Sequence, residues 1–121
     1  MSKIILTVDD SRTMRHMLWL SLVEAGFEVL QAEDGVHGLE VLEGKVPDVI
    51  VTDINMPRMD GYGFIEGVRA NPLHRAIPIL VLSTESSTEK KMRARDAGAT
   101  GWIVKPFSPA KLLDAIRRVA A

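Results

Sequence analysis

The chain has 121 residues, enough for one domain, and its 15 Lys and Arg against 16 Asp and Glu leave a formal net charge of −1. This balance argues against a dedicated nucleic-acid binder, because such proteins normally carry a basic excess. The hydrophobic content of 46% argues against intrinsic disorder, and the absence of cysteine excludes disulfides, thiolate metal sites and a Cys nucleophile. Acidic residues occur within the first ten positions, too early for a signal peptide or a membrane span, so we expect a cytoplasmic protein.

Short apolar runs typical of buried strands alternate with helix-like segments along the chain. In chain order, we expect a strand at residues 4–8, a helix at 12–25, a strand at 27–32, a helix at 35–43, a strand at 48–52, a helix at 62–70, a strand at 78–82, a helix at 88–97, a strand at 102–104 and a helix from 109 onward. Ser11 is a suitable N-cap, Gly26, Gly44 and Gly98 stop helices, and Pro109 suits a first helical turn. The apolar positions expected to face the core from the first and last helices are Met14, Met17, Leu18, Leu22, Val23, Leu112, Leu113, Ile116 and Val119.

Five strand–helix units without a linker predict one α/β domain over residues 1–121, with no output domain. Five units could form half a barrel, but an open, doubly wound parallel sheet is the usual solution for a single domain. In such a sheet, with strand order 2-1-3-4-5, functional residues gather outside the carboxyl ends of the strands.

Chemically active side chains follow the predicted strands at those ends. Asp9 and Asp10 follow the first strand, Asp53 the third, Ser83 the fourth and Lys105 the fifth. Clustered carboxylates repel one another unless a cation neutralises them, and Mg²⁺ prefers oxygen ligands of this kind. A carboxylate nucleophile, a metal, a lysine and a hydroxyl together indicate a phosphoryl-transfer site.

These residues also occur in recognisable motifs. Val8-Asp9-Asp10, the Asp-Ile-Asn-Met-Pro-Arg-Met-Asp-Gly run at 53–61, Leu82-Ser83 and Lys105-Pro106-Phe107 stand in the chain in this order. Together they closely resemble the receiver domain of two-component response regulators, over the whole chain. The resemblance implies a flavodoxin-like fold and is strongest to the stand-alone chemotaxis regulators.

The resemblance assigns a role to each matching residue. It implies that Asp53 is the phosphoacceptor and that Asp10, Asp53 and the Asn55 backbone carbonyl bind Mg²⁺, with Asp9 acting through a metal-bound water. It implies that Ser83 and Lys105 contact the phosphoryl group. It places Ser83 and Trp102 at switch positions, where Trp102 is either a moving side chain or a simple packing residue. Asn55 and Glu85 stand where the family tunes the rate of dephosphorylation.

The same resemblance implies the partners. A chemotaxis-type sensor histidine kinase would donate the phosphoryl group, and the surface of the last two helices and the last strand would bind a target, the flagellar motor switch. We expect a monomer that binds neither nucleic acid nor membrane. The fourth helix departs from the family pattern because it is distinctly basic, which leaves open a different acidic target or selection of one chemotaxis pathway among several. Its basic residues are Lys90, Lys91, Arg93 and Arg95.

Other functions fit the sequence less well. A phosphorelay intermediate or phosphate sink stays open, whereas an aspartyl-phosphate phosphohydrolase would need a second Asp in place of Asn55 and a cap domain. A flavodoxin-like electron carrier would need a hydroxyl-rich loop in place of Asp9 and Asp10 to bind the flavin phosphate. No P-loop motif is present, and the glycines of residues 61–67 do not follow a strand as a dinucleotide loop does.

Three further expectations concern single residues. His16, His37 and His74 lack metal-ligand spacing, so we expect all three at the surface. Met14, Met17, Met56 and Met59 are expected to pack in the core rather than form a binding surface. Against the low frequency of cis X-Pro bonds, we expect Lys105-Pro106 to be cis, because a sharp reversal there would aim Lys105 at Asp53.

Overall fold

The computed structural model describes residues 2–120 and contains five strands and five helices that alternate along these residues. The strands are β1 (Ile4–Val8), β2 (Glu28–Ala32), β3 (Val49–Thr52), β4 (Ile79–Ser83) and β5 (Gly101–Val104). The helices are α1 (Arg12–Glu24), α2 (Gly35–Leu42), α3 (Gly61–Ala70), α4 (Thr88–Ala97) and α5 (Pro109–Ala120).

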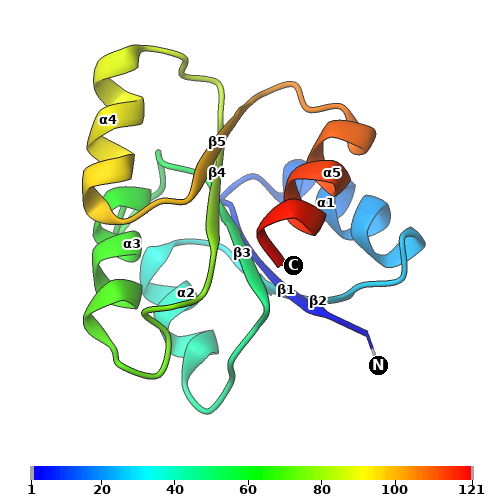
Figure 1. Cartoon of the computed structure of the whole chain (residues 1–121), viewed down its shortest axis with the longest axis horizontal. Helices are drawn as coiled ribbons and strands as arrows, with labels where there is room; N and C mark the ends of the chain where they lie inside the picture. The colour runs from blue at the N-terminus through cyan, green and yellow to red at the C-terminus, as the bar shows by residue number, and fades with distance from the viewer. Residues whose placement is uncertain (1, 121) are drawn as a thin grey trace.

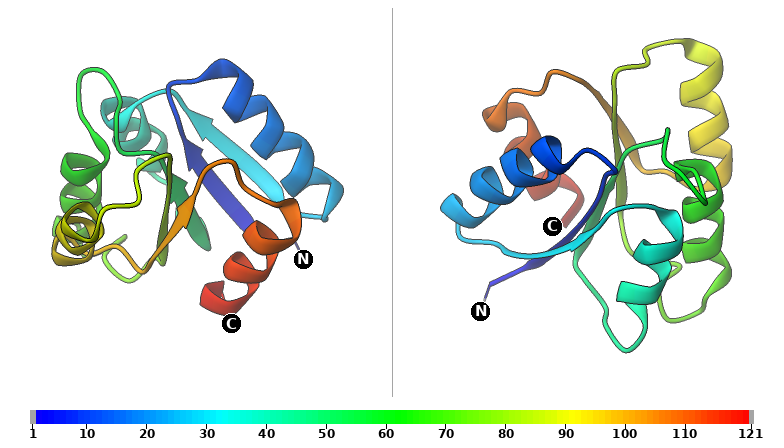
Figure 2. Two further views of the ribbon diagram at one scale, coloured as in Figure 1. Left: turned by 90° about the horizontal axis from the view of Figure 1, so that it is seen from above. Right: turned by 180° about the vertical axis from the view of Figure 1, so that it is seen from behind.

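The strands form one parallel sheet in the order β2-β1-β3-β4-β5, as predicted. In Figure 1, helices α2, α3 and α4 cover one face of this sheet, and α1 and α5 cover the other. The two further views in Figure 2 show the same three-layer arrangement from above and from behind. Strand β1 lies between β2 and β3, so the carboxyl ends of β1 and β3 are direct neighbours.

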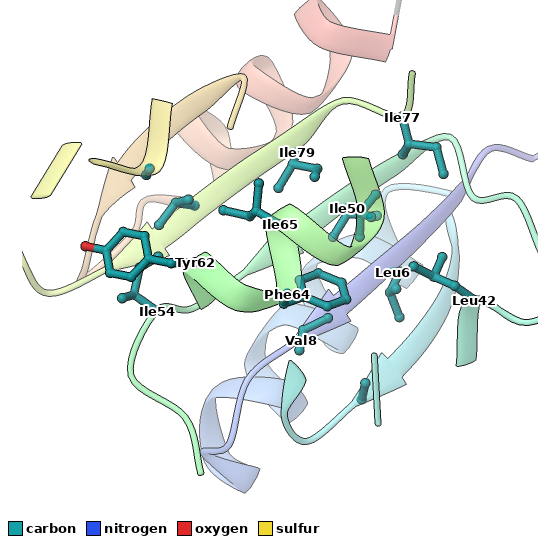
Figure 3. Packing of buried hydrophobic residues seen from close by; sticks show 14 residues of the cluster. Leu6, Val8, Leu42, Ile50, Ile54, Tyr62, Phe64, Ile65, Ile77 and Ile79 are labelled. Atoms are coloured by element: carbon teal, nitrogen blue, oxygen red, sulfur yellow. The ribbon is translucent and has the colours of Figure 1, made fainter. Parts of the chain in front are cut away.

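Each face of the sheet has its own apolar core, because successive side chains of a strand point to opposite faces. In β4, Ile79 and Val81 enter the core shared with α3, whereas Leu80 and Leu82 enter the core shared with α1 and α5. Figure 3 shows the first core, where Phe64 of α3 lies fully buried against the sheet. Both faces of the central strands are therefore dry, which explains their continuous hydrophobicity in sequence.

The predicted elements are confirmed, with boundaries that differ by at most one residue. Strand β4 includes Ser83 as its last residue and begins after Pro78, which donates no backbone hydrogen bond. On α1, Met17 and Val23 are 47% and 41% exposed, so the prediction that they face the core is wrong. The helix buries Leu18 and Leu22, one turn apart, and a residue next to either of these is rotated by about 100° around the helix axis.

The prediction that all three histidines lie at the surface is wrong for His74. Its side chain is buried, and its Nε2 lies 2.8 Å from the carbonyl oxygen of Lys45, so it joins the α3–β4 loop to the α2–β3 loop. His16 is exposed, and Nδ1 of the half-buried His37 accepts a hydrogen bond from the Glu33 N–H. Within residues 2–120, no helix is long and apolar enough to cross a membrane.

Candidate functional site

The sheet brings the three predicted carboxylates together at its carboxyl edge. Val8 and Thr52 are register partners, so the residues that follow them, Asp9 and Asp53, are adjacent. The Asp53 N–H donates to the Val8 carbonyl at 2.9 Å, which extends the β1–β3 ladder into the site. Asp9, Asp10 and Asp53 each offer a carboxylate oxygen within 4.8 Å of the others. Asp9 is buried, Asp53 is half-buried and Asp10 is exposed, so the cluster opens to solvent on one side.

Lys105 lies between two of these carboxylates. Its Nζ is 3.0 Å from Asp9 Oδ2 and 3.1 Å from Asp53 Oδ2, and its side chain is only 10% exposed. The Lys105 N–H donates to the Ser83 carbonyl at 2.8 Å, which fastens the end of β5 to the end of β4. The peptide bond between Lys105 and Pro106 is cis, as predicted.

The pKa values at this edge reflect burial opposed by ion pairing. Burial raises the pKa of Asp9, and this outweighs the hydrogen bonds from the Ser11 N–H and from Lys105, which favour the carboxylate. Burial lowers the pKa of Lys105, but the hydrogen bond and charge of Asp9 and the charge of Asp53 raise it more. One ammonium group pairs with two of the three clustered carboxylates, so the site retains negative charge that can attract a further cation.

Backbone contacts fix the orientation of the carboxylates. The Ile54 N–H donates to Asp53 Oδ1 at 2.7 Å, and the Ser11 N–H donates to Asp9 Oδ1 at 2.8 Å. The loop after β3 closes tightly over Asp53, because a Cβ at position 61 would overlap the Asp53 carbonyl oxygen. Glycine at position 61 is therefore a steric requirement of the site.

Ser83 and Trp102 are connected through the backbone of Glu85. The buried Ser83 Oγ accepts a hydrogen bond from the Glu85 N–H at 3.2 Å, and the Trp102 indole Nε1 donates to the Glu85 carbonyl at 2.9 Å. The Glu85 carboxylate in turn lies 2.9 Å from Lys90 Nζ on α4. Ser83, Glu85 and Trp102 were candidates from the sequence. Their connection could not be predicted, because it depends on the course of the β4–α4 loop.

Asn55 lies on the exposed loop after β3, and with Glu85 it lines a cleft of about 300 Å³. The family resemblance assigns both residues to control of the dephosphorylation rate, and both line this cleft. Lys90 and Arg93 of α4 also line it, and the Arg93 guanidinium lies 4.0 Å above the centre of the Tyr62 ring. No described residue donates a backbone hydrogen bond to the Asn55 carbonyl.

Two arginine contacts near the site were missed by the sequence analysis. Arg15 Nη1 donates to the Asp9 carbonyl at 2.7 Å, and Arg58 forms two hydrogen bonds with the buried carboxylate of Asp34. An arginine at the next helical turn after Asp-Asp gives a weak sequence signal for the first contact. The second joins residues 24 positions apart, and no local pattern indicates it.

The donor set of this edge suits a small, hard divalent cation. Carboxylate oxygens from three residues lie close enough to share one ion, and the Asn55 carbonyl lies two residues beyond Asp53. Mg²⁺ takes oxygen ligands of this kind and keeps several bound waters, whose positions phosphate oxygens can occupy. Asp53 is the more accessible of the two carboxylates that contact Lys105, so it is the better placed nucleophile.

Comparisons with known proteins agree with this geometry. A family model described as the response regulator receiver domain matches residues 5–117. Chemotaxis protein CheY1 of Helicobacter pylori strain J99 is 39% identical over 117 residues, which cover 95% of this chain and 94% of CheY1. Sensor histidine kinase CheAY of Helicobacter pylori is 36% identical over 117 residues, which cover 95% of this chain and 15% of that longer protein.

Solved structures show the same fold over nearly the whole chain. The chemotaxis response regulator CheY4 of Vibrio cholerae has a TM-score of 0.93 and 44% identity, with 98% of this chain and 99% of CheY4 covered. The receiver domain of sensor histidine kinase PA1611 from Pseudomonas aeruginosa has a TM-score of 0.92 and 26% identity, with 99% of this chain and 98% of that domain covered. That structure holds a magnesium ion coordinated in its active site cleft.

Proposed function

Because the chain belongs to the response regulator receiver family and is CheY-like, we propose that it is a phosphorylation switch whose phosphoacceptor is Asp53. The observation that carries this proposal is the position of Lys105 Nζ, within 3.1 Å of Asp53 Oδ2 and 3.0 Å of Asp9 Oδ2 at the carboxyl edge. An ammonium group held beside a partly accessible carboxylate is suited to receive the oxygens of an incoming phosphoryl group.

In the proposed reaction, Asp53 Oδ attacks the phosphorus of a phosphohistidine on a partner kinase. The bond between phosphorus and the donor nitrogen breaks as the aspartyl phosphate forms, and the nitrogen retains the electron pair. Lys105 leaves its ion pair with Asp53 and pairs with a phosphoryl oxygen, while the Ser83 hydroxyl donates to another. The Ile54 N–H fixes the Asp53 carboxylate through one oxygen and leaves the other toward Lys105.

Asp9, Asp10, Asp53 and the Asn55 carbonyl would hold Mg²⁺ at this edge. The ion would neutralise the carboxylates and the negative charge of the phosphoryl group. Asp10 is the most exposed of the three aspartates, and Asp9 is fixed by the Ser11 N–H and by Lys105. This arrangement supports direct ligation by Asp10 and Asp53, with Asp9 acting through a metal-bound water.

The proposed output is a change of the surface formed by α4, β5 and α5, which would bind a target. The Ser83–Glu85–Trp102 contacts lead from the phosphoryl site to this surface. In chemotaxis the proposed target is the flagellar motor switch, and the basic side chains of α4 favour an acidic segment of it. Asn55 and Glu85, which line one cleft, are proposed to set the rate of self-dephosphorylation.

Phosphorylation of Asp53 can be tested with acetyl phosphate and Mg²⁺, read as an increase in intact mass. Wild type is expected to gain one phosphoryl group, and Asp53→Asn none. Asp60→Asn is the matched control, because Asp60 lies on the same loop and caps α3 through the Gly63 N–H, a role that Asn can retain. Equal phosphorylation of Asp53→Asn and wild type would exclude Asp53 as the phosphoacceptor.

A further inference from the structure

An ion pair fastens the loop after β3 to the loop after β2. Arg58 Nε lies 2.8 Å from Asp34 Oδ2, and Arg58 Nη2 lies 3.0 Å from Asp34 Oδ1, so the pair is bidentate. The Asp34 side chain is 4% exposed, whereas that of Arg58 is 53% exposed. Asp34 Oδ1 also accepts the His37 N–H and so caps α2. The carboxylate is therefore fixed by the helix, and the arginine reaches across to it from the neighbouring loop.

The tip of the β3–α3 loop, residues 58 and 59, is held in an unusual backbone conformation. Arg58 has φ of 64°, a left-handed value that is strained for a residue with a side chain. The Gly35 N–H donates to the Met59 carbonyl at 3.2 Å, and a Cβ on Gly35 would lie 2.7 Å from Met59 Cγ. The ion pair and this backbone bond together hold the tip against the start of α2.

The base of the same loop is fastened separately. The Gly61 N–H donates to the Ile54 carbonyl at 2.8 Å, directly after Asp53. Asn55 lies between base and tip, and among the described residues no backbone hydrogen bond joins Asn55 to another part of the chain. The direction of its carbonyl is therefore set by the two fastened ends of the loop, and Arg58 is three residues away.

We infer that Arg58, through its ion pair with Asp34, is a positioning residue that directs the Asn55 carbonyl toward the Mg²⁺ site. This inference rests on the proposed function, because it concerns the same metal site. Arg58 pairs with Asp34 and is not one of the residues proposed to bind the ion or the phosphoryl group. It acts by joining the loop tip to Asp34 at the start of α2, a contact that neither alanine nor glycine can make, so that the carbonyl ligand is oriented in advance. Residues that orient metal ligands in this way typically change metal affinity by about 10-fold or more when removed.

The direction of the effect separates positioning from charge. Removal of a nearby cation makes an acidic site more attractive to Mg²⁺, so Arg58→Ala would raise the affinity if the arginine acted only through its charge. If it positions the Asn55 carbonyl, the same substitution lowers the affinity. Arg58→Gly separates positioning from stability, because glycine adopts a φ of 64° without strain. A purely stabilising role predicts that the glycine variant keeps the wild-type affinity.

The experiment titrates the metal-free protein with MgCl₂ by calorimetry and measures unfolding of the same samples in urea. The variants are Arg58→Ala, Arg58→Gly and Arg58→Lys, and the matched control is Arg75→Ala, an exposed arginine on the α3–β4 loop. We expect the alanine and glycine variants to bind Mg²⁺ about 10-fold more weakly than wild type. The lysine variant recovers part of this loss, because lysine keeps the charge but lacks the fork of donors. The control keeps the wild-type affinity.

Unchanged or tighter binding by Arg58→Ala and Arg58→Gly, with normal binding by wild type, would overturn the inference and leave the proposed metal site intact. Affinity that follows stability across the series, with Arg58→Gly close to wild type, would also overturn it. Failure of the proposed site itself has a different signature, since wild type and Asp10→Ala would then give the same Mg²⁺ titration.

Discussion

Glu85 connects the proposed phosphoryl site to the proposed target surface through three different groups of one residue. Its N–H donates to Ser83 Oγ, its carbonyl accepts from Trp102 Nε1 and its carboxylate pairs with Lys90. If the Ser83 hydroxyl turns toward a phosphoryl group, its contact with the Glu85 N–H is the first to change. The backbone of Glu85 then transmits the change to β5 and α4, as a shift between existing conformations.

Trp102 fluorescence should report this change. Trp19→Phe removes the other indole of the chain, so the remaining emission comes from Trp102. We expect the emission to change when beryllofluoride and Mg²⁺ are added, because the hydrogen bond from Nε1 to Glu85 lies on the path from Ser83. Trp19→Phe combined with Asp53→Asn is the control and should not respond. A constant Trp102 signal together with unchanged target binding would make Trp102 a packing residue.

Asp34 should make the stability of the fold pH-dependent. The hydrogen bonds from Arg58 lower the pKa of Asp34, burial opposes this, and the His37 N–H lowers it further, so the net pKa is below the usual 3.8. A lowered pKa in the folded state gives stability that is present above pH 3.8 and is lost as the pH falls through the folded value.

Asp34→Asn keeps an oxygen for the α2 cap but loses the charge that pairs with Arg58. We expect it to be less stable than wild type by a constant amount between about pH 7 and pH 5, and the difference to shrink at about pH 3. Urea unfolding of both proteins at these pH values measures the effect. A difference that stays constant down to about pH 3 would contradict the ion pair as its source.

Helix α4 ends against a partly buried arginine of α3. Its C-cap, Gly98, has φ of 120°, and a Cβ there would lie 2.7 Å from Arg69 Cγ. Arg69 donates to the carbonyls of Gly98, Arg75 and Ile77, so it joins the end of α4 to the loop before β4. The first turn of α4 is held instead by the ion pair between Lys90 and Glu85. Movement of the helix at its first turn is thus compatible with a fixed last turn.

Gly98→Ala and Gly26→Ala separate the role of Arg69 from backbone strain. Gly26 has φ of 94°, and a Cβ added to it would have nothing within 4 Å, so alanine there costs only the left-handed strain, about 1–2 kcal/mol. We expect Gly98→Ala to cost measurably more in the free energy of unfolding, because the methyl group displaces Arg69 from its carbonyl partners. Equal losses in urea unfolding would show that Arg69 adapts without cost.

The elements were predictable because local patterns determine them. Continuous apolar runs identify strands that are buried on both faces, and the caps Ser11, Gly26 and Gly98 identify helix ends. The exposure of Met17 was harder to predict, because the buried face of α1 is narrow and includes Leu18 and Leu22 but not their neighbours. His74 was misjudged because its partner, the Lys45 carbonyl, is 29 residues away.

At the scale of the whole molecule, the order of the strands determines where most of the site residues lie. Once β1 and β3 are neighbours, Asp9 and Asp53 must meet, and the sequence therefore predicted the cluster of carboxylates. The Lys105 contacts depend on β5, two strands away from β3, yet they were predictable from the resemblance to the family. The ion pair of Asp34 with Arg58 and the contacts of Glu85 depend on loop geometry, which no periodic pattern encodes.

We expect the carboxylate cluster to make the stability of the whole fold dependent on Mg²⁺. Asp9, Asp10 and Asp53 each offer a carboxylate oxygen within 4.8 Å of the others, and the only lysine among them pairs with Asp9 and Asp53, so their repulsion opposes folding without a metal ion. Mg²⁺ bound to the folded state alone stabilises it by RT ln(1 + [Mg²⁺]/Kd), about 2.7 kcal/mol at 100 times Kd. We expect thermal unfolding of wild type to move to higher temperature as Mg²⁺ is added.

Asp10→Ala should remove this dependence and leave a metal-free protein that is as stable as wild type or more so, because one repelling charge is gone and Asp10 is exposed. The matched control is Asp96→Ala, an exposed aspartate on α4 outside the cluster, which should keep the wild-type response. Melting curves with and without Mg²⁺ for the three proteins measure both effects. If wild type is indifferent to Mg²⁺, the three carboxylates do not form a metal site.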